Sequence, residues 1–435
     1  MSAEAPIDPV ATGNALVAAR SFADLPAVHT LLARLRNQGR PVWVTPDGYR
    51  PFWAVTRHAQ VVAASSDNAT FISSRRLNLM SRLQEAAAFK GGERYGAVLR
   101  TLVHMDEPDH RDYRAVAQPW FNALAVRQQM GSLKELSEEF MGQLAARAGA
   151  DGVGEIDFAA EIATWFPLRV IMSILGIPLS DLPLMHRLTK TLSAPQDPDF
   201  SVDTAAGASM FDSIPEFTDY FLAVIADRRR APRNDLATVI ANGTIGGAPL
   251  GELEAVSYFI TMAVAGHDTT AAAMAGGCQA LAERPEAWAR LKREPELLKS
   301  AAEEMIRWVT PIKHFMRTAT RNCELGGQAI RAGEAIAMFY LAANFDEEVF
   351  DAPQEFRIDR SPNRQIAFGF GPHVCMGMVL SRLELTTWYA EMLSRVESLA
   401  MTGPARILES NFLGGYKSVP IRFRLAGGQV NGSSI

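Results

Sequence analysis

Apolar positions recur every three or four residues over much of the chain, which predicts amphipathic helices. This spacing is found in residues 27–37, 58–65, 110–121, 132–148, 158–175, 217–229, 253–283, 285–292, 295–308 and the stretch that follows 377. Residues 41–45 and 51–55 instead alternate around Pro-Asp-Gly at 46–48, which predicts a β-hairpin. Short strands are expected at 323–330 and 335–340, and a terminal hairpin at 412–422. The pattern therefore predicts a mainly α fold with a minor β portion.

Three segments lack this periodicity. Residues 73–100 mix apolar and charged side chains, and we expect them to form a loop over a substrate, since long irregular segments are often functional. Residues 193–215 are rich in Pro, Asp and Ser and are expected to form a lid, whereas 243–251 predict a polar loop. Residues 1–20 are expected to be flexible. No linker or repeat divides the sequence of residues 21–435, which are expected to form a single domain.

Composition narrows the class of protein. A hydrophobic content of 48% suits one large core, and a net charge of −5 argues against nucleic-acid binding. The three cysteines, Cys278, Cys323 and Cys375, are far apart, which indicates a reducing compartment and not a disulfide framework. The sequence begins without a signal-peptide pattern, and Asp268 interrupts its most apolar stretch. We therefore expect a cytoplasmic protein without a membrane anchor.

The segment Phe-Gly-Phe-Gly-Pro-His-Val-Cys-Met-Gly at 368–377 combines glycines with a cysteine just before a helical pattern. A cysteine near a helix start has its thiolate form favoured. Such a thiolate, with one open side, suits the axial ligand position of haem iron. An isolated cysteine is more often a small buried hydrophobic residue. Here the cysteine is one of six positions that together match the pattern of a haem-binding loop: Phe368, Gly369, Gly371, His373, Cys375 and Gly377. A match at all six is expected by chance on the order of 10⁻⁸ per starting position.

A second unusual stretch is Ala-Gly-His-Asp-Thr-Thr at 265–270, in the middle of the apolar helix 253–283. An acid and a hydroxyl inside a buried helix are costly unless they are paired or functional. Threonines can bond back to the preceding turn, and Gly266 weakens the helix. We expect a widened turn here, with room for a small ligand and a water. The alternative is a helix that is only kinked by satisfied polar groups.

Two pairs of charged residues have helical spacing. His110 and Arg114 are four residues apart, and Glu304 and Arg307 are three apart. Each pair shares one helix face. Taken in isolation, the first is a common solvated polar face, and the second is an ion pair of small energetic value.

Together these motifs resemble the cytochrome P-450 family of haem-thiolate monooxygenases, in its bacterial form, over nearly the whole chain. The resemblance implies the P-450 fold and haem b, with Cys375 as the axial ligand of the iron. It implies that Asp268 and Thr269 are the catalytic residues that deliver protons. It implies haem contacts at Phe368, Gly369 and Gly377. It implies ligands of the haem propionates at His110, Arg114, Arg317 and His373. It also implies that Glu304, Arg307 and Arg360 are structural and hold the cysteine loop in place.

Residues 165–168 (WFPL), 310–313 (TPIK), 315–319 (FMRTA) and 411–415 (NFLGG) are similar to the bacterial branch of the family that includes the α-terpineol hydroxylase. This similarity implies hydroxylation of a small apolar substrate, a monoterpenoid or an alkyl or aryl hydrocarbon. The implied pocket residues are Val264, Ala265, Phe315 and Leu413. Gln365, Phe345 and Ser381 depart from the common family pattern without removing a catalytic group.

The resemblance also implies partners. The reaction would use O₂ and two electrons, which a [2Fe–2S] ferredoxin and an NAD(P)H-dependent reductase would supply. Arg111, Arg364 and Arg382 are candidate residues for docking of the ferredoxin. A monomer is expected. The alternatives are a peroxide-using haem-thiolate enzyme, a non-enzymatic protein that binds haem or a hydrophobic ligand, and a haem-free protein with a chance match. The first of these typically lacks the acid–alcohol pair that stands at Asp268 and Thr269 here.

Overall fold

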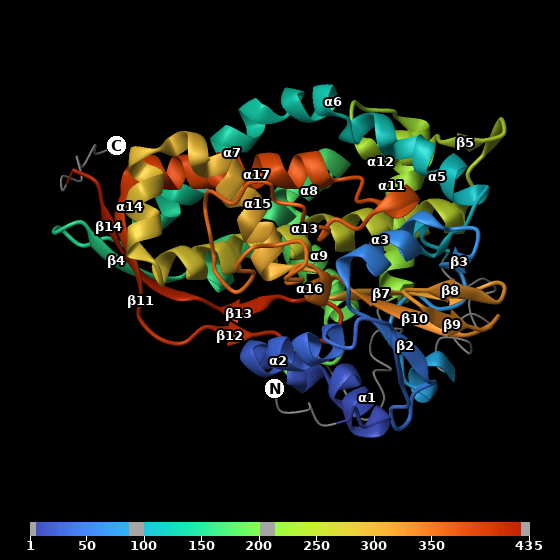
Figure 1. Cartoon of the computed structure of the whole chain (residues 1–435). Coiled ribbons are helices and arrows are strands. Elements are labelled where there is room, and N and C mark those ends of the chain that lie inside the picture. Colours follow the sequence, from blue (N-terminus) through green and yellow to red (C-terminus); the bar gives the residue numbers. More distant parts are fainter. Residues whose placement is uncertain (1–5, 87–99, 201–213, 428–435) are drawn as a thin grey trace.

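The computed structural model describes residues 6–86, 100–200 and 214–427. Helices dominate, and the longest, α13 (Glu252–Ala282), crosses the interior of the molecule in Figure 1. The other helices are α1 Pro9–Val17, α2 Leu25–Arg36, α3 His58–Ser66, α5 Asp109–Ala117, α6 Ala123–Gln128, α7 Met130–Ala145, α8 Trp165–Leu175, α9 Leu182–Ser193, α11 Ile214–Arg230, α12 Leu236–Ala241, α14 Pro285–Arg293, α15 Leu298–Val309, α16 Tyr340–Ala343 and α17 Met378–Arg395. In the described part of the chain, no helix combines the length and the apolar character that a membrane crossing requires.

The strands form small sheets beside the helices. Their bounds are β1 Val42–Val44, β2 Phe52–Val55, β3 Phe71–Ile72, β4 Val153–Asp157, β5 Thr244–Ile245, β6 Ala248–Pro249, β7 His314–Ala319, β8 Cys323–Leu325, β9 Gln328–Ile330, β10 Ala335–Phe339, β11 Val396–Met401, β12 Arg406–Ile407, β13 Tyr416–Ser418 and β14 Pro420–Leu425. The largest sheet has the order β1-β2-β10-β7-β3, and β10 pairs with β2 in parallel but with β7 antiparallel. A three-stranded sheet has the order β11-β14-β4.

Local chemistry explains several of the element ends. Asp24 caps the first turn of α2 by accepting from the backbone N–H of Ala27 at 3.1 Å. The helix α8 ends at Gly176, which has a φ of 65° and so takes the left-handed conformation without steric cost. These signals lie in the sequence, and the predicted helices and the hairpin at β1 and β2 are confirmed.

Some predictions of local structure were wrong. Residues 243–251 are not only a loop but contain the hairpin β5–β6. The segment 412–422 does not pair with itself, because β13 pairs with β12, and β14 lies between β11 and β4. Before α8, residues Ala159–Ala163 form a π-helical turn that no pattern indicated. Much of the expected covering loop and lid, at 87–99 and 201–213, lies outside the described residues.

Close packing around α13 shapes the interior. A Cβ at Gly266 would lie 2.8 Å from Cγ1 of Ile171, so this glycine allows α8 to approach the helix. A Cβ at Gly276 would lie 2.7 Å from the ring of Tyr416. The helix is α-helical throughout its length, so the expected widened turn at 265–270 is not formed. Gly266 therefore allows helix–helix contact, and not the widened turn that we expected it to favour.

Candidate active site

The cysteine segment forms a closed loop immediately before α17. The backbone N–H of Cys375 donates to the carbonyl of Phe368 at 2.8 Å, and that of Val374 donates to Gly371 at 3.0 Å. Gly369 and Gly371 have φ values of 74° and 71°, so both turns require a residue that tolerates the left-handed region. The sequence thus folds this segment tightly enough to hold the thiol in one place.

The Cys375 thiol has an accessible surface although protein surrounds it, so it borders an internal hollow. Gly377 borders open space as well, since a Cβ there would meet no atom of the described residues within 4 Å. Burial raises the pKa of the Cys375 thiol, more than the Gly377 N–H, Arg114 and Arg382 lower it. The stabilisation of the thiolate that we expected from the start of the helix is therefore outweighed by burial. A thiol in such surroundings becomes a thiolate when it coordinates a metal ion.

One face of α13 is open at the middle of an otherwise buried helix. Ala265 is exposed, and Thr261, Val264 and Thr269 are partly exposed, at spacings that place them on one side. The Thr269 hydroxyl donates to the carbonyl of Ala265 at 3.0 Å, which is the back-bonding that the sequence suggested. The open face therefore presents small side chains and the hydroxyls of Thr261 and Thr269.

The helices that carry these groups are joined directly. The Thr270 hydroxyl on α13 donates to the Ser381 hydroxyl on α17 at 3.1 Å. Ser381 is in the first turn of the helix that follows the cysteine loop. This bond holds the Thr269 region of α13 and the Cys375 loop in a fixed relation.

Asp268 does not face the open side but is tied to α9. Its Oδ1 accepts from Lys190 Nζ at 2.5 Å and lies 3.1 Å from Nε2 of His267. Its Oδ2 is buried and has no protein hydrogen-bond partner among the described residues. Burial opposes ionisation of Asp268, but the charges of His267 and Lys190 prevail and hold its pKa well below the usual range. The carboxylate is thus ionised and paired.

A cavity of about 300 Å³ lies beside this ion pair. Asp268, Lys190 and His186 line it together with Leu413. Burial, together with the charges of Lys190 and His267, lowers the pKa of His186 to about 4, so this ring is neutral at physiological pH. Asp268 therefore borders a cavity whose lining also includes other ionisable side chains.

Four basic groups, His110, Arg114, Arg317 and His373, lie close enough to act on one another. The rings of His110 and His373 have centroids 3.9 Å apart, and the Ser73 hydroxyl lies 3.3 Å from Nε2 of His373. Burial, together with the charges of Arg317, His110 and Arg114, lowers the pKa of His373 to about 3. Arg317 on β7 is only 4% exposed.

These four groups have little acidic compensation. Nδ1 of His110 lies 3.4 Å from Glu107, which is half-exposed, and Asp106 acts on Arg317 only through space. A buried guanidinium is costly without an anion. The cluster formed by His110, Arg114, Arg317 and His373 therefore fits a pair of carboxylates such as the haem propionates. Together with the accessible thiol of Cys375 and the open face of α13, the donor set fits haem b.

Glu304, Arg307 and Arg360 meet as the sequence suggested. Nε and Nη2 of Arg307 donate to the two carboxylate oxygens of Glu304 at 2.7 and 2.8 Å, and Nε of Arg360 contacts both at 3.1 and 3.0 Å. All three are at most 4% exposed. Asn344 extends the network, since its carbonyl accepts from Arg307 and its Oδ1 accepts from the N–H of Ile366 near the cysteine loop. The network is thus connected to the cysteine loop through Asn344 and stabilises it.

The expected pocket residues lie on three different segments. Val264 and Ala265 share the open face of α13, and the ring of Phe315 packs on Phe412 with centroids 5.4 Å apart. Leu413 is 3% exposed and forms a bridge to Ile312. It lines the cavity beside Asp268.

The candidate docking arginines differ in their surroundings. Arg111 and Arg364 are exposed. Arg382 stacks on the Phe368 ring, with Cζ 4.8 Å from the centroid, and its Nη2 donates to Glu303 at 3.0 Å. Its charge is therefore partly neutralised within the protein.

Sequence reasoning missed Lys190, His267 and Ser73 as partners of the site. Lys190 and Asp268 are 78 positions apart, and no local pattern marks the lysine as a counter-ion. The burial of Asp268 was itself a signal, because an acid in an apolar helix requires a cation nearby. It could not indicate which cation.

Comparison with known proteins agrees with this geometry. A family model described as Cytochrome P450 matches residues 205–418. The chain is 33% identical to cytochrome P450-terp of Pseudomonas sp, over 98% of the chain and 100% of that relative. It is 31% identical to a steroid C26-monooxygenase of Mycolicibacterium smegmatis, over 91% and 90% of the two chains.

Solved structures give the same result. CYP108D1 from Novosphingobium aromaticivorans is similar with a TM-score of 0.87 and 36% identity, covering 97% of this chain and 100% of that one. Mycobacterium marinum CYP268A2, crystallised in complex with pseudoionone, has a TM-score of 0.85 and 28% identity, covering 96% and 100%. The mainly helical architecture is therefore the P450 fold. By its sequence similarity and its fold, the chain belongs to the cytochrome P450 family and is a monooxygenase that binds haem b through a cysteine thiolate.

Proposed function

We propose that the chain hydroxylates a small apolar molecule of the monoterpenoid or alkyl- or aryl-hydrocarbon class, with O₂ and two electrons from a [2Fe–2S] ferredoxin and its NAD(P)H-dependent reductase. The observation that carries the proposal is the open face of α13, where the methyl groups of Ala265 and Val264 border the hollow next to Thr269. Apolar side chains select an apolar substrate by excluding water. The similarity to cytochrome P450-terp and to a structure with bound pseudoionone supports the same size class.

Haem b, when bound, supplies the activation of O₂ and the insertion of one of its oxygen atoms. Cys375 would hold the iron, and the accessible thiol supports this role. The cluster of His110, Arg114, Arg317 and His373 would hold the propionates. In this arrangement the chain fixes the cofactor from the cysteine side and from its edge.

Thr269 would hold a water at the open face of α13. Its proton is donated to the Ala265 carbonyl, so its oxygen lone pairs remain free to accept from a water. That water is then positioned to give up a proton where the substrate is oxidised.

Asp268 would pass protons from the cavity beside it to the Thr269 water. Its Oδ2 has no described protein partner, so this oxygen can take a water from the cavity side. Its Oδ1 is bound to Lys190 and His267, so a relay by that oxygen requires the Lys190 contact to open. The ion pair thus both keeps Asp268 ionised and restrains its movement.

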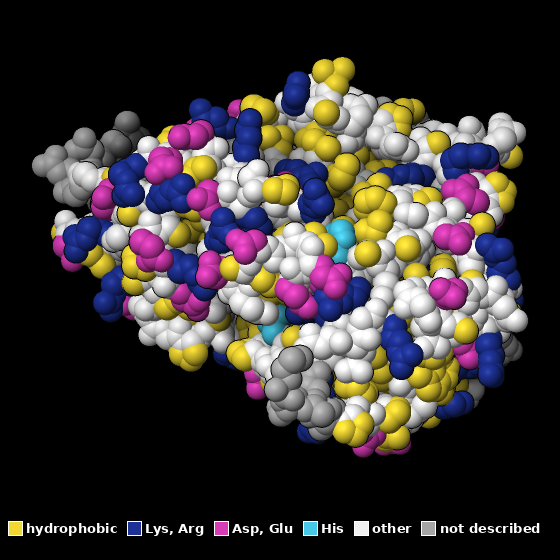
Figure 2. Space-filling model, viewed as in Figure 1, with side chains coloured by type: hydrophobic (Ala, Val, Ile, Leu, Met, Phe, Trp, Pro, Cys, Tyr) yellow, Lys and Arg dark blue, Asp and Glu magenta, His cyan; other side chains and the backbone are white. Residues whose placement is uncertain are grey.

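A ferredoxin would dock on the cysteine side of the molecule. Figure 2 shows this face, which includes α17, with Lys and Arg side chains interspersed among Asp and Glu. Arg111 and Arg364 are exposed and could contact an acidic partner, whereas Arg382 is already paired with Glu303. Docking would therefore depend more on the first two.

The test is a titration of the ferric haem-loaded protein with α-terpineol, p-cymene, biphenyl, dodecanoate and a steroid, followed by the haem Soret band. A low- to high-spin shift with the first three, and hydroxylated product with a surrogate ferredoxin and reductase, are expected. A shift with the steroid alone would overturn the proposed size class. Product formation with hydrogen peroxide but not with the reductase would indicate the peroxide-using alternative, and binding without turnover would indicate a ligand-binding protein.

A further inference from the structure

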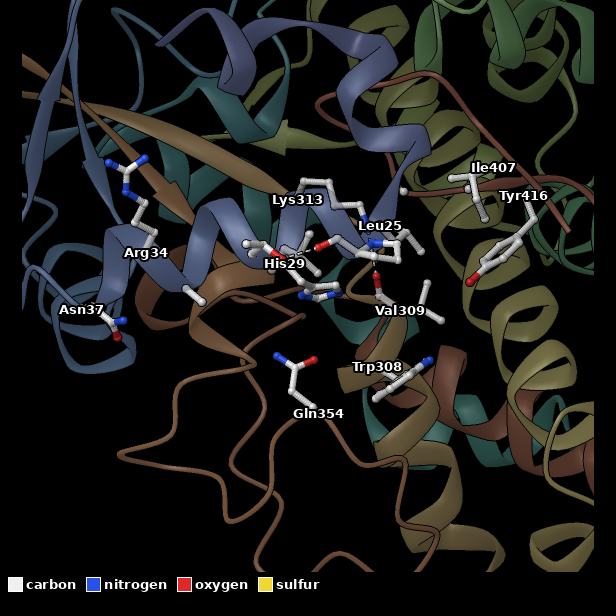
Figure 3. A pocket seen from close by; sticks show the side chains of 16 residues that line it. Leu25, His29, Arg34, Asn37, Trp308, Val309, Lys313, Gln354, Ile407 and Tyr416 are labelled. Atoms are coloured by element: carbon white, nitrogen blue, oxygen red, sulfur yellow. Dashed lines mark hydrogen bonds between the residues drawn. The ribbon is translucent and has the colours of Figure 1, made fainter. Parts of the chain in front are cut away.

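A second and larger cavity lies away from the cysteine loop and from α13's open face. It has a volume of about 700 Å³ and lies between α2, the end of α15 and the segment that leads into β13. Figure 3 shows Lys313 and His29 at its centre, Tyr416 and Ile407 to one side, and Arg34 and Asn37 to the other. This volume is typical of sites for small molecules.

The lining is apolar with basic groups and no acid. Among the described residues that line the cavity there is no Asp or Glu, whereas His29, Arg34 and Lys313 are basic. The indole of Trp308 and the side chains of Leu25 and other aliphatic residues form the rest of the wall. Arg34 is already engaged, since Nη2 donates to the carbonyl of Pro6 at 2.9 Å.

Lys313 is the unusual member. It is 3% exposed, and its Nζ donates to the Val309 carbonyl at 3.1 Å. An ammonium carries three donors, so two remain for a ligand in the cavity. Burial lowers the pKa of Lys313 to about 7, which shows that the fold gives this charge little compensation.

His29 is a second residue of this cavity with an unsatisfied hydrogen-bonding atom in the described structure. Its Nδ1 is buried and has no hydrogen-bond partner in the described structure. Burial, together with the nearby charges of Lys313, Arg36 and Arg307, lowers the pKa of this ring to about 3. The ring is therefore neutral and can donate from Nδ1 in one tautomer. Buried polar atoms of this kind are rare in native proteins and usually have a partner such as a water or a ligand.

The segment around Gly414 packs against the side chain of Lys313 and restrains it. Gly414 lies against it, and a Cβ at that position would collide with Cε and Nζ of Lys313. The backbone N–H of Lys313 donates to the Phe412 carbonyl at 2.8 Å. Gly415 and Tyr416 line both this cavity and the one beside Asp268, so the segment forms a wall between them.

We propose that this cavity is a second binding site, separate from the substrate site, for a small organic anion that combines a carboxylate with an apolar chain or ring. Lys313 and His29 would bind the carboxylate, and the apolar wall would bind the body. The competing explanation is that Lys313 only caps the C-terminal carbonyls of α15.

The test uses the haem-loaded protein saturated with clotrimazole, which occupies the iron and the substrate site. Octanoate is then titrated by calorimetry, with octan-1-ol as the uncharged probe of equal length. We expect octanoate to bind at least about tenfold more tightly than octan-1-ol, as expected for hydrogen bonds to a charged group. No binding of octanoate, or equal binding of both probes, would overturn the proposal.

Lys313→Met should weaken octanoate binding by about tenfold or more while the clotrimazole spectrum stays unchanged. Lys299→Met, an exposed lysine of α15, is the matched control and should have no effect. If Lys313 only caps α15, Lys313→Met would lower the melting temperature without changing the affinity for octanoate, and the proposal would fail.

A measurement on the wild type requires no variant. In the free protein Lys313 is largely neutral at pH 8, and a bound carboxylate favours the ammonium, so octanoate binding should take up close to one proton. At pH 6 the uptake should be near zero. The neighbouring titratable groups stay neutral across this range, because burial and the charges of Lys313, Arg36 and Arg307 lower the pKa of His29, and burial raises the pKa of Tyr416. Binding without this pH-dependent uptake would also contradict the proposal.

Discussion

Replacement of Lys190 by methionine tests the ion pair behind the candidate catalytic acid. The change leaves Asp268 buried with its Oδ1 facing only His267, at 3.1 Å. Removing one partner of a buried pair costs about 3–5 kcal/mol, and because His267 remains, we expect the lower end. A chain of 435 residues has an unfolding entropy of about 0.9 kcal/mol/K, so the melting temperature should fall by about 3 °C at pH 7.

The pH dependence of this loss has a definite sign. The pKa of Asp268 is lower in the folded state than in the unfolded chain, so the pair stabilises the fold above about pH 4. That contribution disappears as the pH falls through the folded pKa. The difference in melting temperature between wild type and Lys190→Met should therefore shrink below about pH 4.

Two further variants make the measurement decisive. Lys299→Met removes an exposed lysine and should change the melting temperature by less than about 0.5 °C. Combining Lys190→Met with Asp268→Asn removes both charges and should recover most of the loss. Calorimetry of the haem-loaded proteins checks all three, and a Lys190→Met protein as stable as wild type at pH 7 would refute the reasoning.

Three other perturbations follow from the site. Cys375→Ser should abolish the thiolate-type band in the carbon monoxide difference spectrum of the reduced haem protein, and retention of that band would exclude Cys375 as the ligand. Thr269→Ala should keep the substrate-induced spin shift but raise the hydrogen peroxide released per NADH severalfold, whereas Thr269→Ser should restore the coupling of NADH consumption to product. Unchanged coupling in the alanine variant would contradict the role proposed for Thr269. Gly266→Ala should destabilise the fold by about 1–2 kcal/mol in urea denaturation, because its Cβ would lie 2.8 Å from Ile171, whereas Gly142→Ala in an open part of α7 should stabilise it by about 0.5–1 kcal/mol. Equal effects at the two glycines would contradict the packing role of Gly266.

The sequence predicted the helices well because their signals are local. The periodicity of α13 and of α15 is carried by residues within one or two turns, and caps such as Asp24 and Gly176 act on their own helix. The strands were predicted less well. β14 lies between β11 and β4, and its pairing with β4 joins positions such as Pro420 and Asp157 that no local pattern connects.

Some site residues could be assigned to their neighbours from spacing alone. Glu304 and Arg307 share one helix face, and Thr269 bonds back four residues to Ala265, as their positions suggested. The effect of burial on the Cys375 thiol was not foreseen, because a helix start favours the thiolate and enclosure by protein opposes it. The sign of that balance depends on how completely the loop is covered.

By itself, the sequence identified the family and the helical class, and it located the cysteine loop and the Asp268-Thr269 motif. Only the tertiary structure decided which groups meet. It paired Asp268 with Lys190 across 78 positions, turned Leu413 toward that pair, and enclosed Lys313 beside His29 in a cavity. The physical reason is that a residue's type and spacing fix what it can donate and which local face it shares, whereas its partner depends on how distant elements pack.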